Sequence, residues 1–182
     1  MVGKRTSDPK RCIALIGFRG CGKTAVGREL ARIIGGSHVD TDELIVQQAG
    51  RSIAEIFAAE GEAGFRRREA EVIRQVFASP PAVVSVGGGA VLDEANVNAI
   101  RAVATVVCLT APAEELWRRI SSDTSTDATR PPLTDRPGLP EVKRLLDERT
   151  PLYSCVADHT VETVERTPQE VALAVRRATD IA

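Results

Sequence analysis

Residues 12–24 read CIALIGFRGCGKT, a short apolar run followed by a glycine-rich turn. The run from Cys12 to Ile16 contains only apolar residues, which predicts a strand buried on both faces. The turn from Gly17 to Thr24 matches the pattern G-x-x-x-x-G-K-[ST] at every fixed position. A chance match is expected in roughly one chain of this size in a hundred, or fewer. Because the match also follows a buried strand, we interpret the turn as a phosphate-binding loop.

The residue types in this loop suit an anionic ligand for separate physical reasons. Glycines allow the backbone to curl so that successive N–H groups point at phosphate oxygens. The helix expected to begin near Gly22 adds its positive N-terminal end. Lys23 is placed to reach the β- and γ-phosphates, and Thr24 is placed to ligate magnesium. The loop therefore predicts a site for a nucleoside triphosphate.

Strand and helix patterns alternate along the rest of the chain. The predicted strands are residues 12–16, 38–40, 82–86, 104–109 and 160–163. Helical patterns cover residues 23–34, 42–49, 65–77 and 112–120, and resume after 142 and 168. Ser52 and Glu55 have the spacing of a capping box and predict a helix start. The alternation predicts a parallel sheet with helices on both faces.

Composition limits the classes of partner. The 182 residues suit one domain. The 24 basic and 25 acidic side chains leave a net charge of -1, so no overall field attracts a nucleic-acid backbone. No apolar run approaches the length of a membrane span. We expect a monomer that binds neither nucleic acid nor a membrane.

The cysteines and the N-terminal residues indicate where in the cell the protein functions. The four cysteines form no CxxC pair, which favours a reducing environment and predicts a cytoplasmic protein. Residues 1–10 are polar and lack the apolar core of a secretory signal. We interpret them as a flexible leader and residues 11–182 as a single domain.

Two acids leave the second predicted strand close to each other. Asp40 and Asp42 are separated by one residue, and the end of a strand in this architecture lies near the phosphate-binding loop. Asp40 is suited to assist a metal, and Asp42 to orient or deprotonate an acceptor hydroxyl. A helix N-cap explains an Asp at this place equally well.

A basic run and a glycine run follow. Residues 65–69 read FRRRE on a predicted helix, where neighbouring side chains point in different directions, so one arginine can turn inward while the others face solvent. A fully solvated basic face is the ordinary explanation. Gly87, Gly88 and Gly89 follow a buried strand and would let a ligand approach the backbone closely. A loose turn gives the same pattern.

Residues 121–140 are rich in Ser, Thr, Asp and Pro and predict a mobile loop. Arg130 and Arg136 lie in this loop, and Arg149 follows it. Arginine suits a bidentate grip on carboxylate or phosphate, and a loop that closes over a transferring phosphate excludes water. Charge facing solvent is the alternative for each arginine taken alone.

These segments together resemble the shikimate kinase family over nearly the whole chain, from about Arg11 to the last helix. The matching elements, in order, are GFRGCGKT, VDTDELI, GEAGFRRRE, SVGGGAV, TRPPL and ERTPLY. The resemblance implies a three-layer α/β P-loop NTPase fold of the nucleoside-monophosphate-kinase type, with a five-stranded parallel sheet flanked by helices. The implied reaction is the phosphorylation of the 3-hydroxyl of shikimate by ATP, with Mg²⁺ as cofactor, in the aromatic amino-acid pathway.

The resemblance also implies roles for individual residues. The ATP-binding residues are Gly20, Cys21, Gly22, Lys23, Thr24, Ala25, Arg119, Arg130 and Pro168, with Arg119 and Pro168 on either side of adenine. The shikimate-binding residues are Asp42, Arg66, Gly87, Gly88, Gly89 and Arg149. The metal positions are Thr24 and Asp40, with Ser85 as a weaker candidate through water. The catalytic residues are Lys23, Asp42 and Arg130.

The chain departs from the family pattern at one place, and two alternative functions stay open. The loop at 121–140 is longer than in compact members and reads Arg-Pro-Pro-Leu where Arg-Pro-Leu is usual, so Arg136 competes with Arg130 for the role of closing arginine. A gluconate kinase would share the phosphate loop and the early acid. A non-catalytic nucleotide-binding module would predict the loss of Thr24, Asp40 or Asp42. Cys21 is either a reactive thiol at a helix start or an inert buried residue.

Overall fold

The fold is described by a computed structural model that places residues 12–122 and 138–181. Its centre is one five-stranded sheet with the order β2-β3-β1-β4-β5, in which every neighbouring pair is parallel. The strands are β1 (Cys12–Ile16), β2 (His38–Asp40), β3 (Val83–Ser85), β4 (Ala104–Thr110) and β5 (His159–Glu162). The predicted parallel sheet and its five strands are confirmed.

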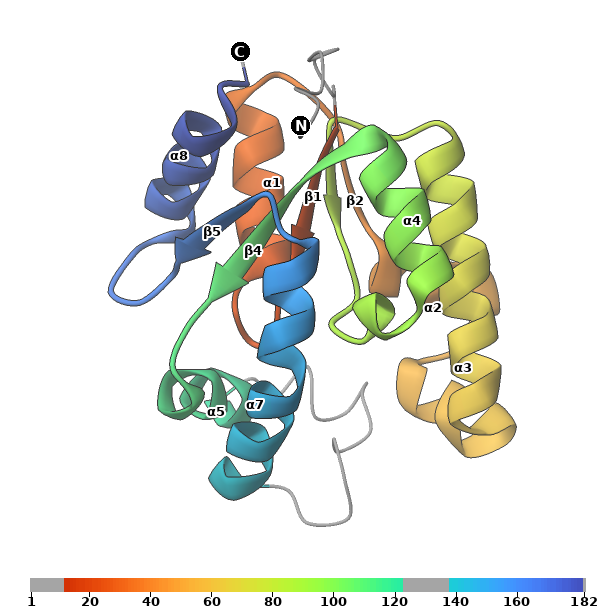
Figure 1. The fold of residues 1–182 in the computed structure, drawn as a ribbon. Helices are drawn as coiled ribbons and strands as arrows, with labels where there is room; N and C mark the ends of the chain where they lie inside the picture. Colours follow the sequence, from red (N-terminus) through yellow and green to blue (C-terminus); the bar gives the residue numbers. More distant parts are fainter. Residues whose placement is uncertain (1–11, 123–137, 182) are drawn as a thin grey trace, which may run out of the picture.

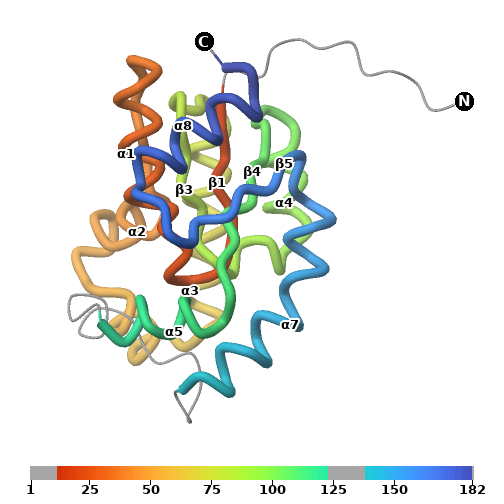
Figure 2. The backbone as a smooth tube through the Cα atoms, turned by 90° about the vertical axis from the view of Figure 1, so that its left-hand side faces the viewer, coloured from red at the N-terminus to blue at the C-terminus, as the bar shows by residue number. Residues whose placement is uncertain are grey.

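Helices cover both faces of the sheet. They are α1 (Lys23–Ile33), α2 (Thr41–Ala49), α3 (Ile53–Ala78), α4 (Glu94–Val103), α5 (Ala113–Ser122), α7 (Leu139–Val156) and α8 (Pro168–Thr179), with a short 3₁₀ helix η1 (Ala90–Leu92). Figure 2 shows α1 and α8 on one side of the strands and α4 and α7 on the other. The result is the three-layer arrangement expected for a parallel sheet.

The central strand β1 determines where the glycine-rich loop emerges. β1 pairs with β3 on one edge and with β4 on the other, and all five of its residues are buried. Ala14 and Leu15 are both fully inaccessible to solvent. Because the strands run in one direction, their carboxyl ends share one edge of the sheet, at the bottom of Figure 1. The loop that follows β1 therefore opens at the middle of that edge.

Local sequence signals explain how α3 begins and where it breaks. The Ser52 hydroxyl accepts from the Glu55 N–H at 3.2 Å, and the Glu55 carboxylate accepts from the Ser52 N–H at 2.7 Å, which completes the predicted capping box. The prediction that helical structure resumes near Phe65 places the start too late. α3 already begins at Ile53, and only Gly61, with φ 68° and ψ −178°, departs from helical geometry.

Other boundaries differ from the sequence prediction. α5 continues through Ser122 and α7 begins at Leu139, so both ends of the predicted loop at 121–140 are helical. Pro140 does not prevent this, because proline is tolerated in the first turn of a helix. α4 is not predicted from the sequence. Asp93 caps this helix by accepting from the Ala95 N–H at 2.8 Å.

Several expectations lie outside the described residues. The flexible leader at residues 1–10 is one of them, and Arg130 and Arg136, both between residues 123 and 137, are the others. Within residues 12–122 and 138–181, no helix combines the length and apolar character needed to cross a membrane.

We predict that Leu15→Ala lowers the free energy of unfolding by about 2–5 kcal/mol, because it leaves a cavity in the central strand. Leu92→Ala is the matched control. Leu92 is 47% exposed, and its truncation should change the free energy of unfolding by less than about 0.5 kcal/mol. Urea denaturation of both variants measures the difference. Equal losses in the two variants would contradict the assignment of β1 as the core strand.

Candidate active site

The loop from Gly17 to Thr24 joins β1 to α1 and needs glycine at defined places. Gly17, Gly20 and Gly22 have φ values of 136°, 84° and 92°, which side chains other than glycine rarely adopt. A Cβ atom on Gly17 would also lie 2.4 Å from the carbonyl oxygen of Leu109 on β4. The loop therefore packs directly on the backbone of the next strand, with no space for a side chain between them.

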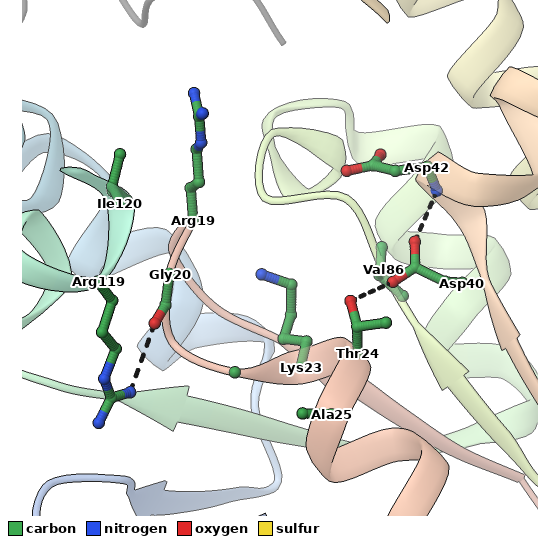
Figure 3. Close-up of a pocket in the computed structure, with 11 residues that line it drawn as sticks. Arg19, Gly20, Lys23, Thr24, Ala25, Asp40, Asp42, Val86, Arg119 and Ile120 are labelled. Carbon is green, nitrogen blue, oxygen red and sulfur yellow. Dashed lines mark hydrogen bonds between the residues drawn. The ribbon is translucent and has the colours of Figure 1, made fainter. Parts of the chain in front are cut away.

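Lys23 places its ammonium group within this loop. Its Nζ atom donates to the carbonyl oxygens of Gly17, at 2.8 Å, and Phe18, at 3.1 Å. The Sγ atom of Cys21 lies 3.7 Å from the same nitrogen. Figure 3 shows the Lys23 side chain rising beside the loop into the pocket. The positive charge thus stands where the glycine-rich backbone turns its N–H groups toward an anion.

Thr24 and Asp40 bring two oxygen atoms together. The Thr24 hydroxyl donates to Oδ2 of Asp40 at 2.6 Å. Oδ1 of Asp40 accepts from the N–H groups of Asp42 at 2.9 Å and Glu43 at 3.3 Å, so Asp40 is also the N-cap of α2. The two explanations of Asp40 are compatible, because one carboxylate oxygen caps the helix while the other faces Thr24.

A pocket of about 280 Å³ unites these groups. Lys23 and Thr24 enter it from α1, and Asp40 and Asp42 from the end of β2 and the start of α2 (Figure 3). Among the described residues, the pocket is lined by Arg19, Gly20, Gly22, Lys23, Thr24, Ala25, Asp40, Asp42, Val86, Arg119 and Ile120. The predicted phosphate, metal and acceptor-hydroxyl groups therefore share one cavity.

A second cluster surrounds Glu69, a buried acid on α3. The carboxylate of Glu69 accepts from Nη1 of Arg66 at 2.6 Å, and its side chain is only 2% exposed. Arg66 is 30% exposed, whereas Arg67 faces solvent and Arg68 bonds Glu60 at 2.9 Å. One arginine of the basic run has therefore turned inward, as one of the two sequence interpretations predicts.

Burial controls the charge state of this acid. Burial raises the pKa of Glu69, and the neighbouring guanidinium of Arg66 opposes that rise without cancelling it. The carboxylate of Asp42 raises the same pKa further, and the guanidinium of Arg149 lowers it. Asp42, Arg66 and Arg149 are thus all close enough to Glu69 to act on it electrostatically, although they come from three different helices.

The glycine run packs against this cluster. A Cβ atom on Gly87 would lie 2.6 Å from Oδ1 of Asp42 and 2.9 Å from Oε1 of Glu69. A Cβ atom on Gly89 would lie 2.5 Å from Nη1 of Arg66. The glycines therefore let two acids and one guanidinium approach the backbone. Gly87 is buried, while Gly88 and Gly89 are partly exposed.

Arg149 and Tyr153 on α7 connect the two clusters. The Cζ atom of Arg149 lies 5.7 Å from the centroid of the Phe18 ring, within the phosphate-binding loop. The Tyr153 hydroxyl donates to the carbonyl oxygen of Gly88 at 2.6 Å. α7 thus contacts both the loop after β1 and the glycine run after β3.

A further cavity brings the two predicted adenine neighbours together. Arg119 on α5 and Pro168 at the start of α8 line one cavity of about 490 Å³. Nη2 of Arg119 donates to the Thr163 carbonyl at 3.0 Å, and Nη1 donates to the Thr163 hydroxyl at 2.9 Å. These bonds hold the guanidinium at the end of β5, and Nη1 also donates to the Gly20 carbonyl in the phosphate-binding loop at 3.4 Å.

Some residues lie elsewhere than the sequence suggests. The hydroxyl of Ser85 donates to the carbonyl oxygen of Lys23 at 2.9 Å instead of pointing into the 280 Å³ pocket. Cys21 is fully buried, which favours an inert thiol. Sequence reasoning assigns no role to Glu69 or Tyr153. The signal for Glu69 was its position three residues after Arg66, because such residues are neighbours on a helix.

Comparison with known proteins identifies the same family as the motifs. The family model described as shikimate kinase matches residues 19–179. A protein named shikimate kinase 2 from Dickeya chrysanthemi is 48% identical over 153 residues, which cover 84% of this chain and 87% of that protein.

Solved structures are similar as well. Shikimate kinase from Acinetobacter baumannii, determined in complex with shikimate, has a TM-score of 0.85 at 34% identity, covering 92% of this chain and 91% of the other. A gluconokinase from Sinorhizobium meliloti has a TM-score of 0.59 at 15% identity, with coverage of 96% and 94%, which shows a shared fold alone.

We predict that the stability difference between the wild type and Glu69→Gln depends on pH. The folded state raises the pKa of Glu69 above its ordinary value of 4.5, so above pH 4.5 the folded state binds more protons at this site than the unfolded state. The wild type should therefore lose unfolding free energy relative to the variant as pH rises from 4.5 through the raised value, by up to about 1.4 kcal/mol per pH unit. Urea titrations between pH 4.5 and 8 measure this, and a pH-independent gap would contradict it.

Proposed function

The chain belongs to the shikimate kinase family and phosphorylates shikimate with ATP as donor, and we propose that the two clusters described above divide this task. The cluster in the loop after β1 holds the nucleotide. The cluster around Glu69 holds the acceptor. Asp42 belongs to both, because it lines the loop pocket and lies beside Gly87 together with Glu69. This shared position of Asp42 is the observation that carries the proposal.

On the donor side, Lys23 and the backbone of Gly20, Cys21 and Gly22 bind the phosphates of ATP. The Lys23 ammonium already lies over the loop through its bonds to two carbonyl oxygens, and it exchanges these for phosphate oxygens when ATP enters. Ala25, the next residue of α1, lines the same pocket. Stabilisation of charge on the transferred group is the main task of such a site.

The Arg119–Pro168 cavity is the adenine site in this proposal. A guanidinium plane and a proline ring are flat surfaces that stack on a purine. Arg119 is held in place by Thr163 and by Glu115, whose carboxylate accepts from its Nε atom at 2.6 Å. Both cavities are lined by Arg119 and Gly22, so one nucleotide can reach from the first into the second.

Thr24 and Asp40 form the site for Mg²⁺ in this proposal. A hydroxyl and a carboxylate 2.6 Å apart offer the hard oxygen ligands that Mg²⁺ prefers, and this ion usually binds through one or two protein oxygens together with waters and phosphates. No group of three or more His, Cys, Asp or Glu side chains suited to a metal occurs in the described parts of the chain. When bound, the ion neutralises charge on the phosphates.

On the acceptor side, Arg66 and Arg149 bind the shikimate carboxylate, since arginine suits bidentate recognition of a carboxylate. Glu69 orients Arg66 through the 2.6 Å ion pair. Gly88 and Gly89 give the ring room beside the backbone, and Gly87 gives Asp42 its place. Asp42 orients the 3-hydroxyl and accepts its proton during transfer.

Arg130 is proposed to close over the phosphates, with Arg136 as the alternative. Both lie outside the described residues, and the sequence pattern TRPPL supports the first. A cytoplasmic location and a monomeric state stay predictions.

The alternatives have weaker support. The likeness to a gluconokinase concerns the fold alone. A non-catalytic nucleotide-binding module would not need Asp42 in the loop pocket beside Lys23 and Thr24. ADP release measured with shikimate, gluconate and other small hydroxy acids tests the substrate. Fastest turnover with shikimate supports the proposal, and faster turnover with gluconate, or none with any acceptor, would refute it.

We predict that Arg149→Ala raises the KM for shikimate about ten- to hundredfold, because a charge-assisted contact is lost. The KM for ATP should change much less. Arg144→Ala is the matched control, since Arg144 lies on the same helix, is 55% exposed and pairs only with Glu148 among the described ion pairs. Steady-state kinetics with each substrate varied measures both constants. A larger effect of Arg149→Ala on the KM for ATP would contradict the carboxylate role.

We also predict that Asp42→Asn lowers kcat about 10²- to 10⁴-fold, the usual contribution of a general base. The isosteric amide keeps the shape of the side chain but accepts a proton poorly. Glu43→Gln, the neighbouring exposed acid on α2, is the control and should leave kcat nearly unchanged. An unchanged kcat with a raised KM would show that Asp42 binds shikimate without taking part in proton transfer.

A further inference from the structure

His38 and Ser85 form a side-chain link behind the phosphate-binding loop. Nε2 of His38 lies 2.9 Å from the hydroxyl oxygen of Ser85. The same hydroxyl donates its one hydrogen to the carbonyl oxygen of Lys23, at 2.9 Å. Because that hydrogen is used, Ser85 can only accept from His38, so Nε2 of the imidazole carries a proton and donates it. The link therefore runs from β2, through β3, to the first residue of α1.

The packing at Gly27 shows how closely this link fits α1. Gly27 lies one helical turn after Lys23 and is buried. A Cβ atom at this position would lie 2.5 Å from Nε2 of His38 and 2.7 Å from the hydroxyl oxygen of Ser85. Only a glycine leaves room for both side chains against the helix backbone. The first two turns of α1 are therefore in direct contact with the His38–Ser85 pair.

The first turn of α1 is held at two neighbouring points. Asp40 and Ser85 are register partners at the ends of β2 and β3. Asp40 bonds Thr24, and Ser85 bonds the adjacent Lys23. The oxygens of Thr24 and Asp40 are also those assigned to Mg²⁺ above, so this contact changes with metal occupancy. The link through Ser85 contacts a backbone carbonyl that no ligand uses, so it is independent of the metal.

We propose that His38 is a positioning residue for the nucleotide: through Ser85 it fixes the Lys23 carbonyl, and thereby the first turn of α1 that carries the Lys23 ammonium and the Thr24 hydroxyl. His38 itself does not line the pocket. Its effect passes through one hydroxyl and one helix turn. This inference rests on the proposed nucleotide site, and it adds a residue that the motif G-x-x-x-x-G-K-[ST] does not contain.

The test compares nucleotide binding in His38→Ala and His38→Gln. Gln carries its terminal nitrogen the same number of bonds from Cα as Nε2 of histidine, and so keeps a donor within reach of Ser85. Isothermal titration with Mg-ADP should show about three- to tenfold weaker binding for His38→Ala, the equivalent of one hydrogen bond. His38→Gln should recover most of this loss. His159→Ala, at the start of β5, is the matched control and should bind Mg-ADP like the wild type.

Substrate kinetics separate positioning from a general loss of structure. His38→Ala should raise the KM for ATP by a similar factor while the KM for shikimate changes less than about twofold. Mg-ADP binding like that of the wild type, no recovery with His38→Gln, or an equal rise of both KM values would each overturn the proposal. A wild type that binds Mg-ADP but does not phosphorylate shikimate would instead overturn the proposed function alone.

A second variant tests the same link without removing the imidazole. Gly27→Ala places a methyl group against His38 and Ser85 and should weaken Mg-ADP binding to a similar extent. Because both changes act on one link, the double variant Gly27→Ala/His38→Ala should lose less affinity than the product of the two single losses. Full additivity of the two effects would contradict a shared pathway through Ser85.

Discussion

The close approach of Gly17 to the backbone of Leu109 is the constraint on which the rest of the site depends. A Cβ atom on residue 17 would lie only 2.4 Å from that carbonyl oxygen, so only glycine is compatible with the turn that follows β1. This turn lies at the centre of the sheet edge. The curl that follows directs Lys23 and Thr24 into the pocket and starts α1 against β2 and β3. The ends of those strands then supply Asp40, Asp42 and the glycine run. The proposed ATP site and the proposed shikimate site therefore lie side by side.

The acceptor side is built around a charge that burial makes unfavourable. Glu69 is almost inaccessible, and a buried carboxylate is stable only when paired and hydrogen-bonded. Arg66 supplies that pairing, and Arg149 contributes at longer range. A carboxylate ligand placed between the two guanidiniums adds a second anion beside the first. The ion pair with Glu69 thus holds the Arg66 guanidinium in place, and in the proposed function this orients Arg66 before shikimate binds.

The fold was largely predictable because its signals are local. The apolar run at residues 12–16, the glycines after it and the capping box at Ser52 each act over a few residues, and all five strands were predicted. α4 was missed because its apolar signal is weak: one of its two buried residues is the polar Asn96, beside Ile100. The loop site was predictable from its fixed spacing. Tyr153 and the His38–Ser85 link were not, because their roles depend on contacts between segments distant in the sequence, such as Tyr153 with Gly88. Glu69 was missed although its pairing with Arg66 is local, because the sequence does not show that this acid is buried.

The central claim is that one cleft holds phosphate on the loop from Gly17 to Thr24 and a small carboxylate between Arg66 and Arg149, with Asp42 between them. A crystal structure of the protein with Mg-ADP and shikimate tests this most directly. We predict that the β-phosphate lies within the loop, that the shikimate carboxylate contacts both guanidiniums and that the 3-hydroxyl contacts Asp42. Shikimate bound with its carboxylate away from both arginines, or ADP outside the loop, would contradict it.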